Sequence, residues 1–228
     1  MSVVLVDYHK GNIRSVERGL QAAGAEVLVS DRPADVRAAD AVVLPGVGAF
    51  SDAAATLDQL GLAAVLREAC AAGVPFLGIC LGMHLMFAGG EEHASADAPA
   101  PGLGLLPGVV GRVPATDLAG RGFKVPHVGW NSVELVPGAP SLPRALFEGI
   151  RDGEFFYFTH SFQAPQTPAT VARTCHARSF PSAVAVPGKP QFGVQFHPEK
   201  SSDAGARLLA NFVRLAARDR GTGITSGF

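Results

Sequence analysis

The sequence has few cysteines, no long apolar run and no excess of charge, and each absence excludes a class of protein. Its three cysteines, Cys70, Cys80 and Cys175, are an odd number at wide spacing, which argues against a disulfide framework and for a reducing cytoplasm. No run approaches the roughly 20 apolar residues of a membrane span. The first residues lack the basic start and apolar core of a secretory signal. We therefore expect a cytoplasmic protein with no membrane partner.

The charged residues are balanced and show no cluster. Nineteen Lys and Arg against 20 Asp and Glu leave a net charge of −1, so nucleic acid is a poor candidate partner. The sequence has no CxxC, HxxxH or HExxH pattern, and it has neither GxxxxGK nor a complete GxGxxG. We therefore expect no metal and no cofactor, and a nucleotide ligand is poorly supported.

What the sequence does contain is enough apolar residues for a sizeable core. The 228 residues are 47% hydrophobic and 17% charged, which suits one ordered domain. The first 90 residues alternate strands with helices, and strands this continuous in apolar residues suit a parallel sheet buried on both faces. The predicted strands are 2–7, 25–30, 41–48 (ending in a glycine loop) and 74–79, and the predicted helices are 12–24 and 62–73.

The second half changes character. A polar loop rich in Pro and Gly spans 89–104, and the strand candidates after it have turn-rich connections, which suggest antiparallel additions to the sheet. A helix over 203–218 follows them. We predict an α/β three-layer sandwich with a largely parallel central sheet, helices on both faces and antiparallel additions in the second half. The expected organisation is a single domain over 1–217 and a flexible tail over 218–228. The strand candidates are 125–136, 154–162, 170–177, 181–186 and 191–199.

Cys80 lies in the segment Gly78-Ile79-Cys80-Leu81-Gly82, between an apolar strand and a predicted helix over 81–88. This segment has the shape of a nucleophile elbow with cysteine in place of serine, because the glycines leave room for a turn that lifts the thiol out of the sheet. A helix N-terminus there favours the thiolate, the nucleophilic form. The alternative is a buried cysteine that happens to sit beside glycines.

A candidate base for this thiol lies in QFGVQFHPEK, residues 191–200. Gln195, His197 and Glu199 lie at period two and share one face of an extended segment, and Pro198 keeps the histidine extended. An imidazole and a carboxylate two residues apart on a strand end can form a base and its orienter. The alternative is a surface turn that opens the last helix. Taken with the elbow, the pattern favours a Cys-His-Glu triad.

The segment LPGVG, residues 44–48, follows the third strand at the edge where parallel sheets usually bind ligands. An acyl-transfer enzyme needs backbone N–H donors for an oxyanion. We expect one donor from Leu81, the residue after the nucleophile, and a second from Val47 or Gly48, where glycines let the chain reorient. The alternatives are a tight turn or a phosphate loop.

Together these segments resemble the class I glutamine amidotransferases, and most closely the glutaminase subunits of imidazole glycerol phosphate synthases. The resemblance covers nearly the whole chain except the tail and 89–104. It implies that Cys80 attacks the side-chain amide of glutamine, that His197 handles the protons and that Glu199 holds His197. The motifs that carry the resemblance occur in the family's order: GNIRSVERGL, LPGVGAF, GICLGMHLMF, VPHVGWNSVE, FFYFTHSF and FGVQFHPEKS.

The resemblance also implies a substrate site and a partner. In this family the ammonia passes to a (β/α)8-barrel cyclase, and the products, imidazole glycerol phosphate and AICAR, serve histidine and purine synthesis. The expected glutamine contacts are Gly46, Gly48, His84, His160, Ser161 and Phe162, and the expected partner face includes Asn12, Trp130, Tyr157 and Lys200.

His84 departs from the family, which usually has glutamine four residues after the nucleophile. Residues four apart share a helix face, so we expect His84 near the thiol, where it either replaces the glutamine in substrate binding or simply packs. The other cysteines, Cys70 and Cys175, are most simply small core residues. For His127 and His160, structural hydrogen bonding is the simplest role.

Three other functions compete with this interpretation. The first is the glutaminase of another amidotransferase, such as anthranilate or aminodeoxychorismate synthase, and PHVGWN speaks against it. The second is a non-catalytic binding module, which an intact Cys80, His197 and Glu199 disfavour. The third is a cysteine hydrolase that needs no partner, and an assay of the isolated chain separates it from the leading hypothesis.

Overall fold

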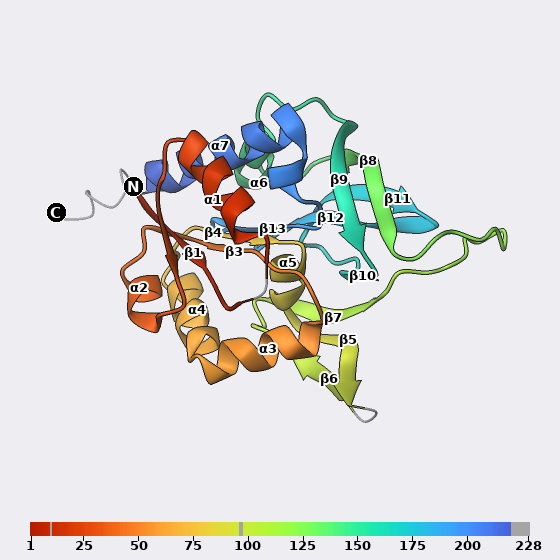
Figure 1. Ribbon diagram of the computed structural model, residues 1–228. Helices are drawn as coiled ribbons and strands as arrows, with labels where there is room; N and C mark the ends of the chain where they lie inside the picture. The colour runs from red at the N-terminus through yellow and green to blue at the C-terminus, as the bar shows by residue number, and fades with distance from the viewer. Residues whose placement is uncertain (10, 96–97, 220–228) are drawn as a thin grey trace.

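The computed structural model describes residues 1–9, 11–95 and 98–219, which form two sheets with helices packed against them (Figure 1). The strands are β1 (Ser2–Val6), β2 (Glu26–Ser30), β3 (Ala41–Leu44), β4 (Phe76–Ile79), β5 (Phe87–Ser95), β6 (Ala98–Pro101), β7 (Leu106–Arg112), β8 (His127–Leu135), β9 (Glu154–His160), β10 (Phe162–Gln163), β11 (Thr170–His176), β12 (Arg178–Ala185) and β13 (Gln191–Val194). The helices are α1 (Ile13–Ala22), α2 (Pro33–Arg37), α3 (Phe50–Gln59), α4 (Leu62–Ala71), α5 (Leu81–Leu85), α6 (Ser141–Leu146) and α7 (Ser202–Asp219), with a 3₁₀ turn at Pro198–Lys200.

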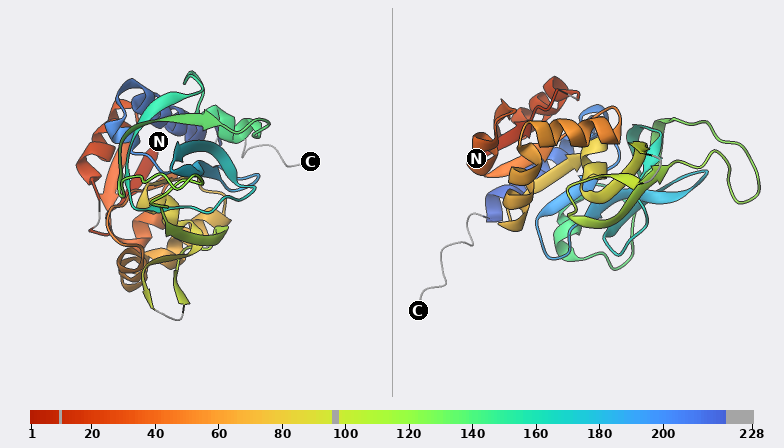
Figure 2. Two further views of the ribbon diagram at one scale, coloured as in Figure 1. Left: turned by 90° about the vertical axis from the view of Figure 1, so that its right-hand side faces the viewer. Right: turned by 90° about the horizontal axis from the view of Figure 1, so that it is seen from below.

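The larger sheet has nine strands in the order β2-β1-β3-β4-β13-β12-β11-β8-β9. The five strands from β2 to β13 are parallel, and β12, β11, β8 and β9 continue the sheet with antiparallel pairs. This confirms the predicted mixture of a parallel centre and antiparallel additions. A smaller sheet, β10-β7-β5-β6, flanks the molecule beside α3 (Figure 2).

Helices cover both faces of the large sheet, with α1, α6 and α7 on one side and α2, α3, α4 and α5 on the other (Figure 1). The strand β1 is apolar from Val3 to Val6 because its alternate residues enter different core clusters. Val3 and Leu5 of β1 join the cluster that holds Leu208 of α7. Val4 and Val6 join the cluster beneath the other helices. The three predicted layers are therefore confirmed.

The predicted loop over 89–104 is wrong, since β5 and β6 form a hairpin there. Its glycines serve close packing rather than turns: a Cβ at Gly90 would lie 2.5 Å from the ring of Phe50 on α3, and one at Gly89 would lie 2.9 Å from the carbonyl oxygen of Ala100. Glycines, which are typical of loops, therefore allow β5 to pack closely against α3 and β6.

The C-terminal helix runs two residues past the predicted end of the domain, because α7 continues to Asp219. The rest of the predicted tail, 220–228, lies outside the described residues. Across the described part of the chain, no helix is both long enough and apolar enough to span a membrane.

Candidate active site

A cavity of about 440 Å³ opens at the carboxyl end of the parallel strands. Segments that are far apart in the sequence meet there: the loop after β3, the turn after β4, the strand β5 and the end of β9. Most of the residues predicted to bind glutamine or an oxyanion border it. The lining residues are Val47, Gly48, Ala49, Cys80, Leu81, His84, Glu92, His93, Pro126, Thr159, His160, Ser161 and Phe162.

Cys80 occupies a strained turn between β4 and α5, with φ of 53°, a left-handed value that only glycine adopts freely. Two glycines make the turn possible. A Cβ at Gly78 would lie 2.6 Å from the carbonyl oxygen of Gly82, and a Cβ at Gly82 would overlap the carbonyl oxygen of Leu44. The Cys80 N–H donates to Val194 O at 2.8 Å, which fixes the turn to β13. Strain at this position is typical of a functional side chain.

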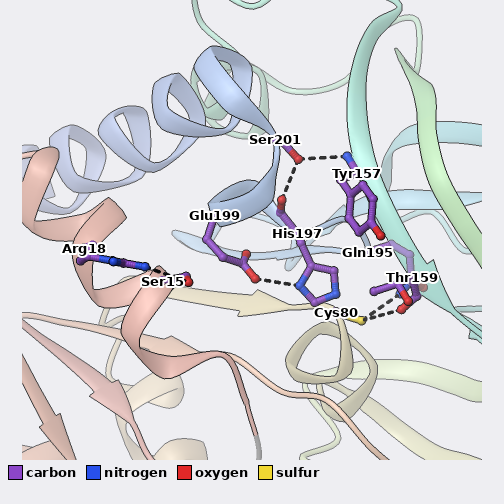
Figure 3. A network of polar contacts seen from close by, with 9 residues as sticks. All are labelled: Ser15, Arg18, Cys80, Tyr157, Thr159, Gln195, His197, Glu199 and Ser201. Atoms are coloured by element: carbon purple, nitrogen blue, oxygen red, sulfur yellow. Dashed lines mark hydrogen bonds and ion pairs between the residues drawn. The ribbon is translucent and has the colours of Figure 1, made fainter.

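His197 is brought to Cys80 from the chain just after β13, and its backbone is held on both sides (Figure 3). Its N–H donates to Tyr157 O at 2.9 Å, and its carbonyl accepts from the Ser201 hydroxyl at 2.6 Å. The same hydroxyl accepts from the Tyr157 N–H at 3.0 Å. His197 is 2% exposed, so these bonds fix its ring in one place beside the sulfur.

Glu199 holds the far side of this ring, with its Oε1 2.9 Å from His197 Nδ1. The contact does not come from a shared strand face, as the sequence pattern predicted, because Pro198–Lys200 forms a 3₁₀ turn that returns the carboxylate to the imidazole. Burial opposes the charged ring, but the negative charges of Cys80 and Glu199 outweigh it and raise the pKa of His197 to about 10. The arrangement therefore favours the protonated form of His197 beside the sulfur.

The loop after β3 lies against the elbow. Gly46 is buried and does not line the cavity, because it sits between the Tyr8 hydroxyl and the Cβ of Leu81. Val47 is 42% exposed at the cavity, and the exposed Gly48 has φ of 100°. Gly46, Val47 and Gly48 were all predicted to bind substrate or an oxyanion. Val47 and Gly48 line the cavity next to Cys80, whereas Gly46 is buried.

His84 lines the same cavity as Cys80, as expected, but its ring contacts another side chain of the protein, that of Gln195. Its Nε2 is 2.7 Å from Oε1 of Gln195, and only 3% of the residue is exposed. Burial lowers the pKa of His84 to about 4, so the ring is neutral at physiological pH. Its contact with Gln195 was not predicted from the sequence.

His160 and His127 form a buried hydrogen-bonded chain next to the cavity. His160 Nδ1 donates to Phe162 O at 2.8 Å, which leaves its Nε2 as acceptor for His127 Nδ1 at 3.0 Å. Asn131 Nδ2 then donates to His127 Nε2 at 3.2 Å. This chain fixes the segment of β9 and β10 that borders the cavity, in line with the structural role expected for both histidines.

Glu92 is a cavity residue that the sequence reasoning missed, because it lies within the segment predicted as a loop. It is partly buried on β5, where its Oε2 accepts from the N–H of Phe50 at 3.1 Å. Burial raises the pKa of its carboxyl, and the bond from Phe50 opposes that rise. The carboxylate is the one acidic side chain among the lining residues of this cavity.

The residues expected at the partner face lie on the surface near the triad. Trp130 is 51% exposed on β8 and meets Tyr157 of β9 edge to face, with ring centroids 6.1 Å apart. Lys200 Nζ lies 5.9 Å from the centre of the Tyr157 ring. Asn12 is half-buried at the start of α1. Two exposed apolar residues here were not predicted, Val128 and Phe155.

The remaining cysteines differ from each other. Cys70 is buried, and burial raises the pKa of its thiol to about 12, consistent with an inert core residue. The prediction that Cys175 is a core residue is wrong, because it is exposed near the end of β11, where buried and exposed side chains alternate from Ala172 to Cys175. Within residues 1–9, 11–95 and 98–219, no group of three or more His, Cys, Asp or Glu could hold a metal ion.

Comparison with known proteins agrees with this geometry. A family model described as Glutamine amidotransferase class-I matches residues 4–216. A Moorella thermoacetica protein named imidazole glycerol phosphate synthase subunit HisH is 45% identical over 213 residues, 93% of this chain and 94% of that protein. A Thermosynechococcus vestitus protein of the same name is 43% identical over 216 residues, 94% and 97% of the two chains.

Solved structures share the fold at lower identity. A crystal structure described as glutamine amidotransferase has a TM-score of 0.68 at 20% identity, covering 94% of this chain and 98% of that one. The glutaminase domain of Trypanosoma brucei CTPS with bound acivicin has a TM-score of 0.64 at 16% identity, covering 96% and 94%. At these identities the likeness bears on the fold alone.

Proposed function

The chain belongs to the class I glutamine amidotransferases, and we propose on this basis that it is the glutaminase subunit of an imidazole glycerol phosphate synthase. It hydrolyses glutamine to glutamate and ammonia and delivers the ammonia to a (β/α)8-barrel cyclase in histidine biosynthesis. The observation that carries the proposal is a strained cysteine at a cavity with a buried His197–Glu199 pair beside it. The names of its relatives support the choice among amidotransferases.

The reaction follows from the positions of three side chains. The Cys80 thiolate attacks the side-chain carbonyl carbon of glutamine, and the imidazolium of His197 gives its proton to the departing nitrogen, which leaves as ammonia. Neutral His197 then removes a proton from water, whose oxygen attacks the thioester and expels the Cys80 thiolate. Glu199 accepts from Nδ1 throughout, which keeps Nε2 directed at the reacting atoms.

Backbone donors stabilise the oxyanion formed in each step. We assign one donor to the N–H of Leu81, which directly follows the nucleophile, and the second to the Val47–Gly48 segment, which lines the same cavity. Gly48 already has a left-handed φ, so the peptide between these two residues can turn without a steric clash from a side chain.

Glutamine itself carries an ammonium and a carboxylate that the cavity must accept. Glu92 supplies the one negative side chain among the lining residues and suits the ammonium. His160, Ser161 and Phe162, which also line the cavity, are proposed to contact the rest of the substrate.

The cyclase is proposed to dock on the surface formed by β8 and β9. Trp130, Val128 and Phe155 expose aromatic and aliphatic surface there, and such residues are typical of the centre of protein interfaces. Tyr157, Lys200 and Asn12 complete the proposed contacts. Three free cysteines fit a cytoplasmic location, which we also propose.

The test uses the purified chain with and without the cyclase and its nucleotide substrate. Cys80→Ala should abolish glutamine hydrolysis but leave the ammonia-driven reaction of the cyclase intact, because only the supply of ammonia is lost. The wild-type chain alone should hydrolyse glutamine poorly, and the loaded cyclase should raise turnover by about 100- to 1000-fold, the usual value of one oxyanion donor.

Two results would contradict the proposal. Full glutaminase activity in the chain alone, unchanged by the loaded cyclase, would favour a hydrolase that needs no partner. Labelling by a glutamine-analogue alkylator mainly at Cys70 or Cys175 would refute Cys80 as the nucleophile.

The variant Lys200→Ala tests the proposed partner face. It should weaken the rise in turnover that the loaded cyclase causes, while leaving the free energy of unfolding nearly unchanged.

A further inference from the structure

Gln195 is completely buried, and its side chain bridges Cys80 and His84. Its Nε2 lies 3.8 Å from Cys80 Sγ (Figure 3). Its Oε1 lies 2.7 Å from His84 Nε2. Its backbone N–H donates to Ser182 O at 2.9 Å, which fixes the backbone of Gln195 to β12. Neither Gln195 nor its bond to the sulfur has a role in the chemistry described above.

The direction of these bonds is set by His84. A primary amide can present either its NH₂ group or its oxygen to the sulfur, and the two choices have opposite electrostatic effects. With an N–H on His84 Nε2, the Gln195 oxygen is drawn to the histidine and the NH₂ group faces Cys80. The reversed amide would set a partly negative oxygen against a thiolate, which is repulsive.

We propose that His84 is a positioning residue that acts through Gln195: it orients the amide so that its N–H stabilises the thiolate of Cys80. This inference rests on the proposed role of Cys80 as the nucleophile. His197 lies beside the same sulfur, but its Nε2 has no hydrogen-bond partner among the described residues, so the Gln195 amide is the donor in contact with Cys80 Sγ. The amide cannot exchange its proton with the substrate, so it supports the charge without entering the proton transfers.

This role differs from a direct contact between His84 and glutamine. A substrate contact would act on the Michaelis constant and would not affect the thiol in the absence of glutamine. An orienting contact acts on the thiol itself, so it is visible with a small reagent that does not use the glutamine site. Iodoacetamide is such a reagent, because only the thiolate reacts with it at an appreciable rate.

The experiment measures the rate of iodoacetamide alkylation of Cys80 against pH in the purified chain. A Cys175→Ser background removes the exposed thiol, and mass spectrometry assigns the label. Gln195→Met keeps the volume and removes the donor, so alkylation near pH 7 should slow roughly tenfold or more, the value of a hydrogen bond to a charged group. The rate profile should also move to higher pH.

His84 is tested by two changes. His84→Phe keeps a ring but leaves the amide free to turn, and it should slow alkylation in the same direction as Gln195→Met. His84→Gln restores an N–H donor near Oε1 and should recover most of the rate. If Gln195→Met does not fold, the comparison of these two variants decides the question, since a packing role would not distinguish a lost donor from a restored one.

The matched control is Gln191→Met. Gln191 is also buried and lies four residues earlier, at the start of β13, but its amide donates to the carbonyl oxygen of Cys70. This change should leave Cys80 alkylation unaltered. An unchanged rate and profile in a folded Gln195→Met or His84→Phe variant would overturn the inference and leave the proposed function intact. No labelling of wild-type Cys80 would instead count against the proposed function.

Discussion

At the scale of single residues, Tyr8 has a fully buried hydroxyl with no hydrogen-bond partner among the described residues. Burial raises the pKa of this phenol and the negative charge of Cys80 adds to the rise, so the group stays neutral. A buried donor without a partner costs about 1–3 kcal/mol. Tyr8→Phe should therefore leave the free energy of unfolding unchanged or raise it by about 1 kcal/mol, measured by urea denaturation.

A matched change at Tyr157 gives the comparison for Tyr8. Tyr157 is only partly buried, so Tyr157→Phe should leave the stability unaltered. A loss of more than about 1 kcal/mol in Tyr8→Phe would mean that the hydroxyl has a hydrogen-bond partner in solution, and the carbonyl groups of the neighbouring Gly46 loop would then be the first place to look.

The pair His197 and Glu199 supports a second prediction at this scale. His197→Ala should lower glutamine turnover by about 100- to 10,000-fold, because it removes the group that moves every proton. Glu199→Gln should cost less, since an amide can still accept from Nδ1 although it loses the charge. Steady-state rates with the loaded cyclase check the order, and near-normal turnover in His197→Ala would contradict the triad.

At the scale of elements, the elbow depends on the space left by its glycines. Gly82→Ala should destabilise the protein by about 1–3 kcal/mol and lower glutamine turnover, because the new methyl group overlaps the Leu44 carbonyl and must displace the turn that carries Cys80. Urea denaturation and the glutaminase assay measure both effects. Gly122→Ala is the control, since a Cβ there meets nothing within 4 Å, and it should change neither quantity.

The elements that the sequence predicted best are those with a single strong signal. The apolar runs of β1, β3 and β4 and the periodic face of α1 were predicted because burial imposes the pattern directly. The helix α3 and the hairpin of β5 and β6 were not predicted. Glycines and prolines in this hairpin are typical of loops, and the close contact of Gly90 with Phe50 that explains one of them depends on tertiary packing.

The candidate site shows the same division. Cys80, His197 and Glu199 could be predicted because each lies in a short sequence segment whose residue types indicate a role: a cysteine between two glycines after a strand, and a histidine with a carboxylate two residues later. The bond between His84 and Gln195 could not, because it joins residues 111 positions apart. The 3₁₀ turn at Glu199 was missed for another reason: period-two spacing gave the right pair of side chains from the wrong backbone conformation.

At the scale of the whole molecule, the order of strands is what assembles the site. β13 pairs with β4 in parallel, which places the chain leading to His197 beside the elbow of Cys80. The edge strand β9 of the same sheet also contacts this segment, because its Tyr157 carbonyl accepts a hydrogen bond from the His197 N–H. The sequence predicted a parallel centre with antiparallel additions but not this order, because similar apolar strands can pair in many ways.

The fold also buries neutral histidines, which ties its stability to pH. Burial lowers the pKa of His84 to about 4 and that of His160 to about 3, and His127 shifts in the same direction. In the unfolded chain each has a pKa of about 6.5. A histidine whose pKa is depressed by folding contributes stability above its unfolded pKa and loses it as the pH falls toward the folded value.

Acid should therefore destabilise the protein before most carboxylates titrate. Between about pH 6 and about pH 5, His84, His160 and His127 each take up a proton mainly in the unfolded state, so the free energy of unfolding should fall by about 3 kcal/mol, at about 1.4 kcal/mol per pH unit for each fully titrating group. His197 adds little in this window: its raised pKa keeps it protonated in the folded state, and in the unfolded chain it is already largely protonated, so its small contribution to stability increases slightly as the pH falls. Urea denaturation at several pH values measures the slope. His84→Gln should reduce the fall by about 1 kcal/mol, whereas a flat profile in the wild-type protein would show that these histidines are charged in the folded state.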